Sequence, residues 1–114
     1  MDFQTPPVVV KPIEGGFRIV LSGPIHTNTS WLERELDDVV NRKPALVELD
    51  LGRSEYVSST GLGIFVSLHN RLAAGGGSLS IVRILPRTRA IFRASALDRL
   101  FRFAPDALVS TEAT

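Results

Sequence analysis

The second half of the chain contains a strand–helix–strand succession that restricts the fold more than any other feature. The run from Ala45 to Leu51 alternates apolar and polar side chains, as a strand with one buried face does. The run from Gly61 to Ala74 is apolar over most of its girth, which indicates a helix lying on a sheet. Glycines 75–77 then turn the chain, and Leu79 to Ile84 indicates another strand. Two strands joined through a helix are expected to be parallel, with a right-handed crossover.

Two more strands and another helix precede this unit. Val8–Val10 and Phe17–Leu21 are rich in β-branched and aromatic residues, which favours strands. Glu14 to Gly16 lies between them and predicts the tight turn of a β-hairpin. Ser30 and Glu33 then have the S-x-x-E form of a capping box, and the apolar residues that follow recur at helical spacing. We therefore expect an amphipathic helix that begins at this box.

The remainder of the chain predicts a third helix, because Pro86 suits a first helical turn. An apolar segment that follows is expected to pack back on the sheet; its members are Leu97, Leu100, Phe101 and Phe103. The predicted order is β-β-α-β-α-β-α, a single α/β domain with a mixed sheet of about four to five strands and about three to four helices. Its core is expected to span about residues 8–104, with residues 1–6 and 105–114 frayed.

The composition excludes several classes of protein. A chain of 114 residues that is 44% hydrophobic and 22% charged is ordinary for one globular domain. There is no cysteine, which removes disulfides, thiolate chemistry and cysteine-type zinc sites. No apolar run approaches the ~20 residues of a membrane helix, and the first residues do not have the pattern of a signal peptide. We expect a soluble, cytoplasmic protein without membrane insertion.

The net charge of +1 conceals an uneven distribution. Residues 1–60 contain nine acidic and six basic side chains, a net of −3, whereas residues 61–114 contain three acidic and seven basic ones, a net of +4. Most of this positive charge belongs to Arg83, Arg87, Arg89, Arg93, Arg99 and Arg102. The arginines fit the solvated face of one helix, which is the interpretation we favour, or an anionic partner. We expect no nucleic-acid partner.

No motif in the sequence indicates catalysis. His26 and His69 lack the spacing of a metal site, so each is expected to be a surface or packing histidine. Gly61 and Gly63 follow a strand, but the third glycine of a dinucleotide loop is missing, and there is no P-loop. Ser59 is not in a G-x-S-x-G elbow. We therefore expect no catalytic residue, no metal, no cofactor and no enzymatic activity.

The hydroxyl triplet Ser58, Ser59 and Thr60 stands between the third strand and its helix. A helix N-terminus has free backbone N–H groups and the positive end of the helix dipole. One hydroxyl is enough to cap it, contributing about 1 kcal/mol. The neighbouring Gly61 and Gly63 leave the segment open to a partner. The triplet is thus a helix cap, an anion-facing loop or a phosphorylation site.

The residues around this triplet resemble a known family. Leu49-Asp50-Leu51-Gly52, followed by Tyr56-Val57-Ser58-Ser59-Thr60-Gly61-Leu62-Gly63, is similar to the signature of the STAS domain. That domain occurs in sulfate transporters and in bacterial anti-sigma factor antagonists. The similarity covers about residues 8–104 and includes Gly23, Gly75–Gly77, Pro86 and the stretch Leu97-Asp98-Arg99-Leu100-Phe101. A chain of this length resembles the antagonists rather than the transporter tails.

The resemblance implies a function in partner switching. In the family, the hydroxyl residue directly before the glycine is the phosphoacceptor, which implies Thr60 here, with Ser59 as second choice. The partner-binding residues would be His26, Ser58, Ser59, Thr60, Gly61, Leu62 and Gly63. The partner would be an anti-sigma factor that is also a serine/threonine kinase, and its binding would release the sigma factor. Phosphorylation ejects the antagonist and a PP2C-type phosphatase resets it. ATP and magnesium belong to the kinase, and a weak homodimer is compatible with this scheme.

Two positions depart from the family pattern and keep alternatives open. The acid that precedes the hydroxyl pair is Ser58 here, and the acid after the second strand is replaced in Gly23-Pro24-Ile25-His26. An alternative function is the STAS subunit of a lipid-trafficking ABC transporter, which holds an ATPase through the same loop without phosphorylation. A third is a nucleotide or small-ligand sensor, for which the sequence offers an open loop and some arginines. The neighbouring genes would separate the first two.

Overall fold

The sheet of the protein begins with a hairpin and continues by adding parallel strands. The computed structural model describes residues 7–109. Its elements are β1 (Val8–Ile13), β2 (Gly16–Ser22), α1 (Ser30–Asn41), β3 (Leu46–Arg53), α2 (Ser59–Ala74), β4 (Ser78–Ile84), α3 (Pro86–Ala94), a 3₁₀ turn (Leu97–Arg99) and β5 (Arg102–Phe103). The five-stranded sheet has the order β1-β2-β3-β4-β5, with β1 antiparallel to β2 and each later pair parallel. The predicted α/β order, the hairpin and the parallel pairing of β3 with β4 are confirmed.

Glycine makes the turn of the hairpin and ties it to the third strand. Gly15 has φ of 85°, a left-handed conformation that glycine adopts without the steric cost of a Cβ. Its carbonyl oxygen accepts the backbone N–H of Leu46 at 3.1 Å, where β3 begins. The hairpin therefore starts the parallel part of the sheet as well as the antiparallel part.

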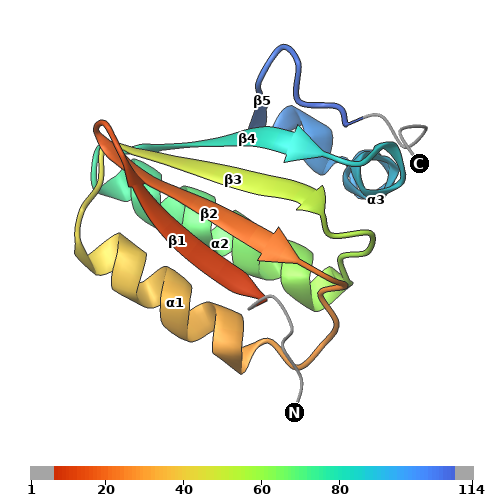
Figure 1. The fold of residues 1–114 in the computed structure, drawn as a ribbon, viewed down its shortest axis with the longest axis horizontal. Coiled ribbons are helices and arrows are strands. Elements are labelled where there is room, and N and C mark those ends of the chain that lie inside the picture. The colour runs from red at the N-terminus through yellow and green to blue at the C-terminus, as the bar shows by residue number, and fades with distance from the viewer. Residues whose placement is uncertain (1–6, 110–114) are drawn as a thin grey trace.

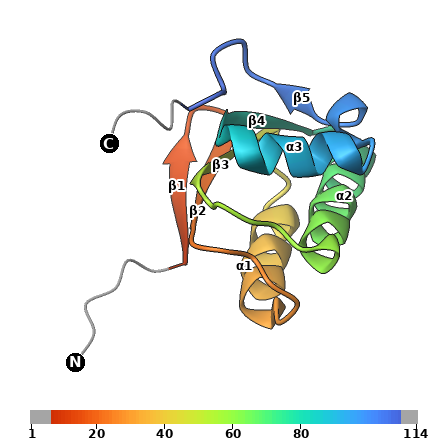
Figure 2. The same ribbon diagram turned by 90° about the vertical axis from the view of Figure 1, so that its right-hand side faces the viewer.

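The helices leave one face of the sheet uncovered. In Figure 1, β1 and β2 pass in front of α2, and in Figure 2 β1 and β2 lie to the left of α1 and α2. The third helix lies near the end of β4, where the hydroxyl of Thr88 donates to the backbone carbonyl of Ser54 at 2.6 Å. Residues 7–109 thus place no helix over the opposite face, which we call the outer face of the sheet. Within the same residues, no helix combines the length and hydropathy that crossing a membrane requires.

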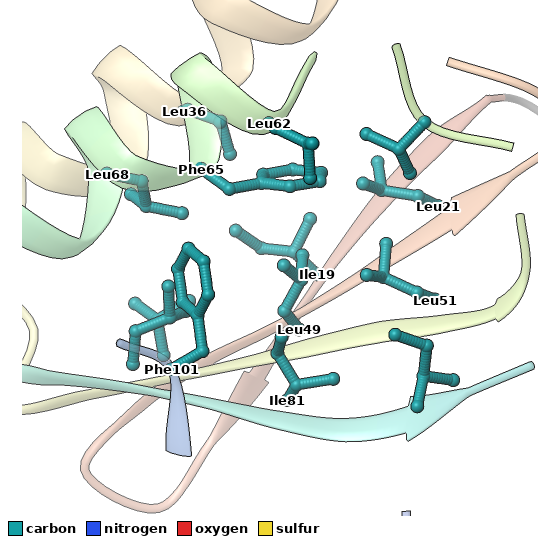
Figure 3. Packing of buried hydrophobic residues seen from close by; sticks show 14 of the residues in the cluster. Ile19, Leu21, Leu36, Leu49, Leu51, Leu62, Phe65, Leu68, Ile81 and Phe101 are labelled. Atoms are coloured by element: carbon teal, nitrogen blue, oxygen red, sulfur yellow. The ribbon is translucent and has the colours of Figure 1, made fainter. Parts of the chain in front are cut away.

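The core lies between the sheet and its two long helices (Figure 3). The alternation that predicted β3 buries Val47, Leu49 and Leu51, as expected. Phe65 of α2 is fully buried above them, with its ring 6.4 Å from that of Phe92 in α3. Further members of the cluster include Ile19, Leu21, Leu36, Leu62, Leu68, Ile81 and Phe101. This packing holds the N-terminal end of α2 in a fixed position on the sheet.

The first helix is capped differently from our expectation. Ser30 is already the first residue of α1, and Thr29 is the N-cap. The backbone carbonyl of Thr29 accepts the N–H groups of Leu32 and Glu33, while its hydroxyl donates to the Glu33 carboxylate at 3.0 Å. The predicted capping box is therefore wrong: the N-cap is Thr29 and not Ser30, and no side chain caps the helix, because the Thr29 hydroxyl donates to the Glu33 carboxylate instead of accepting a backbone N–H.

The chain beyond Phe103 continues in an ordered conformation to Val109. The backbone N–H of Ile84 donates to the carbonyl of Ala107 at 2.8 Å, and the N–H of Val109 donates to the carbonyl of Ile84 at 2.9 Å. Fraying was expected from residue 105; residues 105–109 include these backbone hydrogen bonds to Ile84, and residues 1–6 and 110–114 lie outside the described ranges. Within the apolar segment, Phe101 is buried as expected, but Leu100 is 38% exposed.

The C-terminal arginines do not form one helical face. Arg83 lies on β4 and Arg102 on β5, whereas Arg87, Arg89 and Arg93 lie on α3. The guanidinium of Arg89 stacks over the ring of Phe103, 4.7 Å from its centroid. The excess of positive charge is therefore divided among separate surfaces, and the favoured interpretation of a single solvated helix face is wrong.

Candidate functional site

The connections that follow β2 and β3 are joined to each other beyond the sheet. The backbone N–H of Ile25 donates to the carbonyl of Tyr56, and the N–H of Ser58 donates to the carbonyl of Ile25, both at 2.8 Å. Ile25 and Val57 form an isolated parallel bridge, and both side chains are buried. We call this pairing of Ile25 with Tyr56, Val57 and Ser58 the clasp. It lies beyond the carboxyl ends of β2 and β3, and ligands of open α/β sheets bind in that region. The hydroxyl triplet therefore stands on a rigid support.

Ser58 is the N-cap of α2. Its Oγ accepts the backbone N–H of Gly61 at 3.1 Å and donates to the carbonyl oxygen of His26 at 2.9 Å. Its side chain points inward, since the residue is only 5% exposed. Because the cap is at Ser58, α2 begins at Ser59. The sequence placed the start of this helix near Gly61, so Ser59 and Thr60 belong to its first turn rather than to a loop before it.

We expect Ser58→Ala to lower the free energy of unfolding by about 1–2 kcal/mol, because the change removes a cap and leaves the His26 carbonyl without its donor. Urea denaturation followed by circular dichroism measures the change. Ser59→Ala is the matched control, since Ser59 is exposed and its effect should stay within about 0.5 kcal/mol. Equal effects of the two substitutions would contradict the assignment of the cap.

The predicted partner-binding residues divide into an exposed and a buried group. His26, Ser59, Thr60 and Gly63 are exposed, whereas Ser58, Gly61 and Leu62 are buried. A Cβ on Gly61 would come 2.9 Å from side-chain carbons of both Ile25 and Val57, so only glycine fits where the helix crosses the clasp. The exposed group can touch a partner directly, and the buried group sets its position.

A groove between α1 and α2 runs past Thr60 and was not expected from the sequence. It encloses about 310 Å³, and its lining residues are Glu33, Leu36 and Asp37 from α1 and Thr60, Gly63, Ile64, Ser67, Leu68 and Arg71 from α2. Arg71 and Asp37 form an ion pair of 2.7 Å across it. Glu33 and Asp37 of α1 thus line the same groove as Thr60. Helix spacing alone could not reveal this, because the groove depends on how the two helices pack.

An aromatic pair borders the same surface. Tyr56 is 43% exposed, and its ring lies 5.7 Å from the ring of His26. Exposed tyrosine is enriched in protein interfaces because it offers a large contact area and a polar end. The sequence signal for Tyr56 was its place two residues before the triplet, and Tyr56 is not among the residues that the sequence predicts to bind a partner. We call His26, Tyr56, Ser59, Thr60 and Gly63 the switch surface.

This combination of sheet topology, clasp and capped helix is characteristic of one class of domain. Comparison with known families identifies the class. Residues 8–109 match the model of the STAS domain. The chain belongs to the STAS domain family.

Individual relatives within this family are regulators of sigma factors by name. The chain is 32% identical over 98 residues to the "Putative anti-sigma factor antagonist BtrV" of Bordetella bronchiseptica, covering 85% of this chain and 84% of that one. An anti-sigma factor antagonist from Mycobacterium paratuberculosis has a similar structure, with a TM-score of 0.75, 29% identity, and coverage of 86% and 84% of the two chains.

More distant structures have the same fold. The antagonist SpoIIAA in its unphosphorylated form superposes with a TM-score of 0.73 at 17% identity, over 87% of this chain and 89% of that one. SpoIIAA of Bacillus in its phosphorylated form gives a TM-score of 0.66 at 17% identity, over 87% and 92%. The arrangement of strands and helices is thus common to the family well below the identity at which side chains correspond.

Proposed function

We propose that this chain is an anti-sigma factor antagonist that regulates transcription by partner switching. It binds a serine/threonine kinase-type anti-sigma factor through the switch surface and is released when Thr60, or secondarily Ser59, is phosphorylated. The observation that carries the proposal is that only one hydroxyl of the triplet is used to cap the helix. Ser58 performs the capping, so the hydroxyls of Ser59 and Thr60 are exposed on the first turn of α2 and make no hydrogen bond within residues 7–109.

The geometry supports a switch that changes the interface and leaves the fold intact. A phosphate adds about −1.5 to −2 charges and three acceptor oxygens. On Thr60 it lies at a helix N-terminus, where the dipole and free N–H groups favour an anion. The cap bonds of Ser58 stay in place, because they involve neither Ser59 nor Thr60. A docked partner would meet the new charge directly.

Two carboxylates of α1 can replace the family acids that this chain lacks near the acceptor. Position 58 holds the capping serine and position 26 a histidine, but Glu33 and Asp37 line the groove that Thr60 also lines. Asp37 is paired with Arg71, whereas Glu33 accepts only the Thr29 hydroxyl among residues 7–109. Glu33 is therefore the carboxylate that can face a basic group of the kinase beside the acceptor.

The relatives favour this function over the transporter alternative. BtrV and the mycobacterial protein are both named as anti-sigma factor antagonists, and SpoIIAA has been solved in an unphosphorylated and a phosphorylated form. In the proposed cycle a PP2C-type phosphatase removes the phosphate, and the whole cycle takes place in the cytoplasm.

Phosphate transfer in vitro tests the proposal. The full chain is incubated with the kinase-type anti-sigma factor of the same organism, ATP and magnesium, and the modified residue is found by mass spectrometry. We expect phosphate on Thr60, a loss of nearly all incorporation in Thr60→Ala, and unchanged incorporation in Ser67→Ala, whose hydroxyl is exposed on the same groove. Phosphate found outside residues 59 and 60, or none, refutes the phosphorylation step. Absence of a complex with the unmodified chain refutes the binding step.

A further inference from the structure

The outer face of the sheet has a hollow of about 320 Å³, on the opposite side from α1 and α2. Figure 1 looks onto this face. The lining residues come from three strands and from the end of β4: Val9, Lys11, Pro12, Ile13, Arg18, Val20, Ser22, Asp50, Arg53 and Arg83. A volume of this size is at the lower end of small-molecule sites. Neither the switch surface nor the groove beside Thr60 shares a residue with it.

The hollow concentrates positive charge at places where the sheet does not neutralise it. Lys11 and Arg18 are direct cross-strand partners in the antiparallel pair, an arrangement of like charges that destabilises a sheet. Arg18 turns to Glu48, with Nε and Nη2 donating to the same carboxylate oxygen at 2.9 and 2.7 Å. Within residues 7–109, Lys11 and Arg53 lie within 4.0 Å of no carboxylate. Two cations of the hollow are thus available to an anion.

The one carboxylate in the lining is engaged with the backbone. Asp50 is 8% exposed, and its Oδ1 accepts the N–H of Gly52 at 2.9 Å. Its Oδ2 lies 3.5 Å from Nε of Arg83, which is at the limit of a hydrogen bond. Asp50 therefore compensates only part of the charge of the arginine beside it. The lining contains four cationic side chains and this single carboxylate.

Apolar side chains lie between the cations. Val9 and Val20 are cross-strand partners, and Val20 is in turn level with Asp50 on β3. On one side of the valine pair, two residues along the strands, lie Lys11 and Arg18. On the other side of the pair, Ser22 of β2 is level with Arg53 of β3. Pro12 and Ile13 extend the apolar strip toward the turn. A ligand with an apolar body could rest on the valines while its anionic group reaches Lys11 or Arg53.

We propose that this hollow, the sheet-face anion site, binds a small phosphorylated organic molecule with an apolar body. The alternation of polar and apolar side chains on a solvated sheet face does not by itself predict a ligand, because exposed sheet faces are commonly polar. The proposal rests on three features together: the surface is concave, Lys11 and Arg53 have no carboxylate partner within residues 7–109, and apolar side chains lie between these two cations. Charge-assisted hydrogen bonds to phosphate oxygens are the contacts these cations can supply. The site is independent of phosphorylation at Thr60.

Nuclear magnetic resonance titration of the full chain with 1-naphthyl phosphate tests the site. We expect the backbone signals of β1, β2 and the end of β3 to shift, and those of the first turn of α2 to stay. Inorganic phosphate and 1-naphthol, titrated separately, should each bind at least about tenfold more weakly, because each has only half of the required chemistry. Equal binding of phosphate, meaning an adventitious ion only, or equal binding of 1-naphthol overturns the proposal, and so does the absence of shifts on the outer face.

Variants assign the cations. Lys11→Gln and Arg53→Gln should each weaken binding by about three- to tenfold, and Arg34→Gln, an exposed arginine of α1, should leave it unchanged. Asp50→Asn retains an acceptor for the Gly52 N–H while removing the negative charge, so it should strengthen binding by about threefold. The same spectra show whether each variant is folded. Weaker binding by Asp50→Asn, or an equal loss in Arg34→Gln, refutes the proposed charge complementarity.

Discussion

Thr60→Glu is expected to weaken the complex with the anti-sigma factor at least about a hundredfold, a change of about 2.7 kcal/mol in binding free energy. The residue is exposed on the first turn of α2 and borders the groove that contains Glu33 and Asp37. A carboxylate at this position adds charge and bulk in the path of a docked partner. Truncating or repelling contacts at the centre of an interface produces effects of this size. Isothermal titration calorimetry with the purified anti-sigma factor measures the change.

The fold of Thr60→Glu should be at least as stable as that of the original chain. An acidic side chain in the first turn of a helix interacts favourably with the dipole, by about 0.3–1 kcal/mol, and α2 has no acid there. Asn70→Glu is the matched control: it adds the same charge at an exposed position of the same helix, away from the groove lining, and should bind normally. A Thr60→Glu variant that binds as tightly as the original chain would show that the first turn of α2 is not the switch.

The order of the elements could be predicted because it depends on local patterns. Alternating side chains predict a strand, the mostly apolar run from Gly61 to Ala74 predicts a buried helix, and paired glycines predict a tight turn. The structure contains each of these as β3, α2 and the β1–β2 turn. The parallel pairing of β3 with β4 followed from the helix between them. Residues 105–109 were less predictable, because their order comes from backbone hydrogen bonds to Ile84 and not from any periodicity.

The place of the hydroxyl triplet at the start of a helix was predictable from the sequence, but which of its hydroxyls caps that helix was not. The triplet contains three hydroxyls that are equivalent as caps in the sequence, and the structure assigns the cap to Ser58 through the His26 carbonyl. That carbonyl belongs to a connection 32 residues away along the chain. Tyr56 was missed for a related reason, since its exposure depends on how the clasp orients the backbone. Contacts between distant segments decide such details, and a single sequence does not encode them as a pattern.

The arginines illustrate the same limit for charge. The count of charged residues locates the excess of positive charge in the second half of the chain, but it does not show on which surface of the fold the arginines lie. Arg83 reaches the outer face beside Asp50, whereas Arg89 covers the ring of Phe103 on another surface. The hollow of the sheet-face anion site also draws on Lys11 and Arg18 from the acidic half. A charge asymmetry along a sequence is thus a poor guide to a charge asymmetry in space.

Gly16→Ala is expected to lower the free energy of unfolding by about 3 kcal/mol, because it forces apart the first residues of β2 and β3. A Cβ at this position would overlap the backbone carbonyl oxygen of Leu46, its Cα partner in the parallel pair. The clash involves backbone, so no side-chain rotation can relieve it. Unlike Gly15, Gly16 does not have a positive φ, and the effect therefore arises from space and not from backbone conformation. Urea denaturation measures it.

Gly63→Ala should raise the free energy of unfolding, and this opposite effect of the same substitution shows that the loss in Gly16→Ala has a steric cause. A Cβ on Gly63 would meet nothing within 4 Å, and the residue lies inside α2. Alanine is favoured over glycine in a helix interior by about 0.8–1 kcal/mol, so this variant should unfold at higher urea concentration than the original chain. A loss below about 0.5 kcal/mol for Gly16→Ala would mean that β2 and β3 do not approach at this point. The parallel sheet would then not begin at the hairpin turn, and the position of the clasp at its far end would no longer follow.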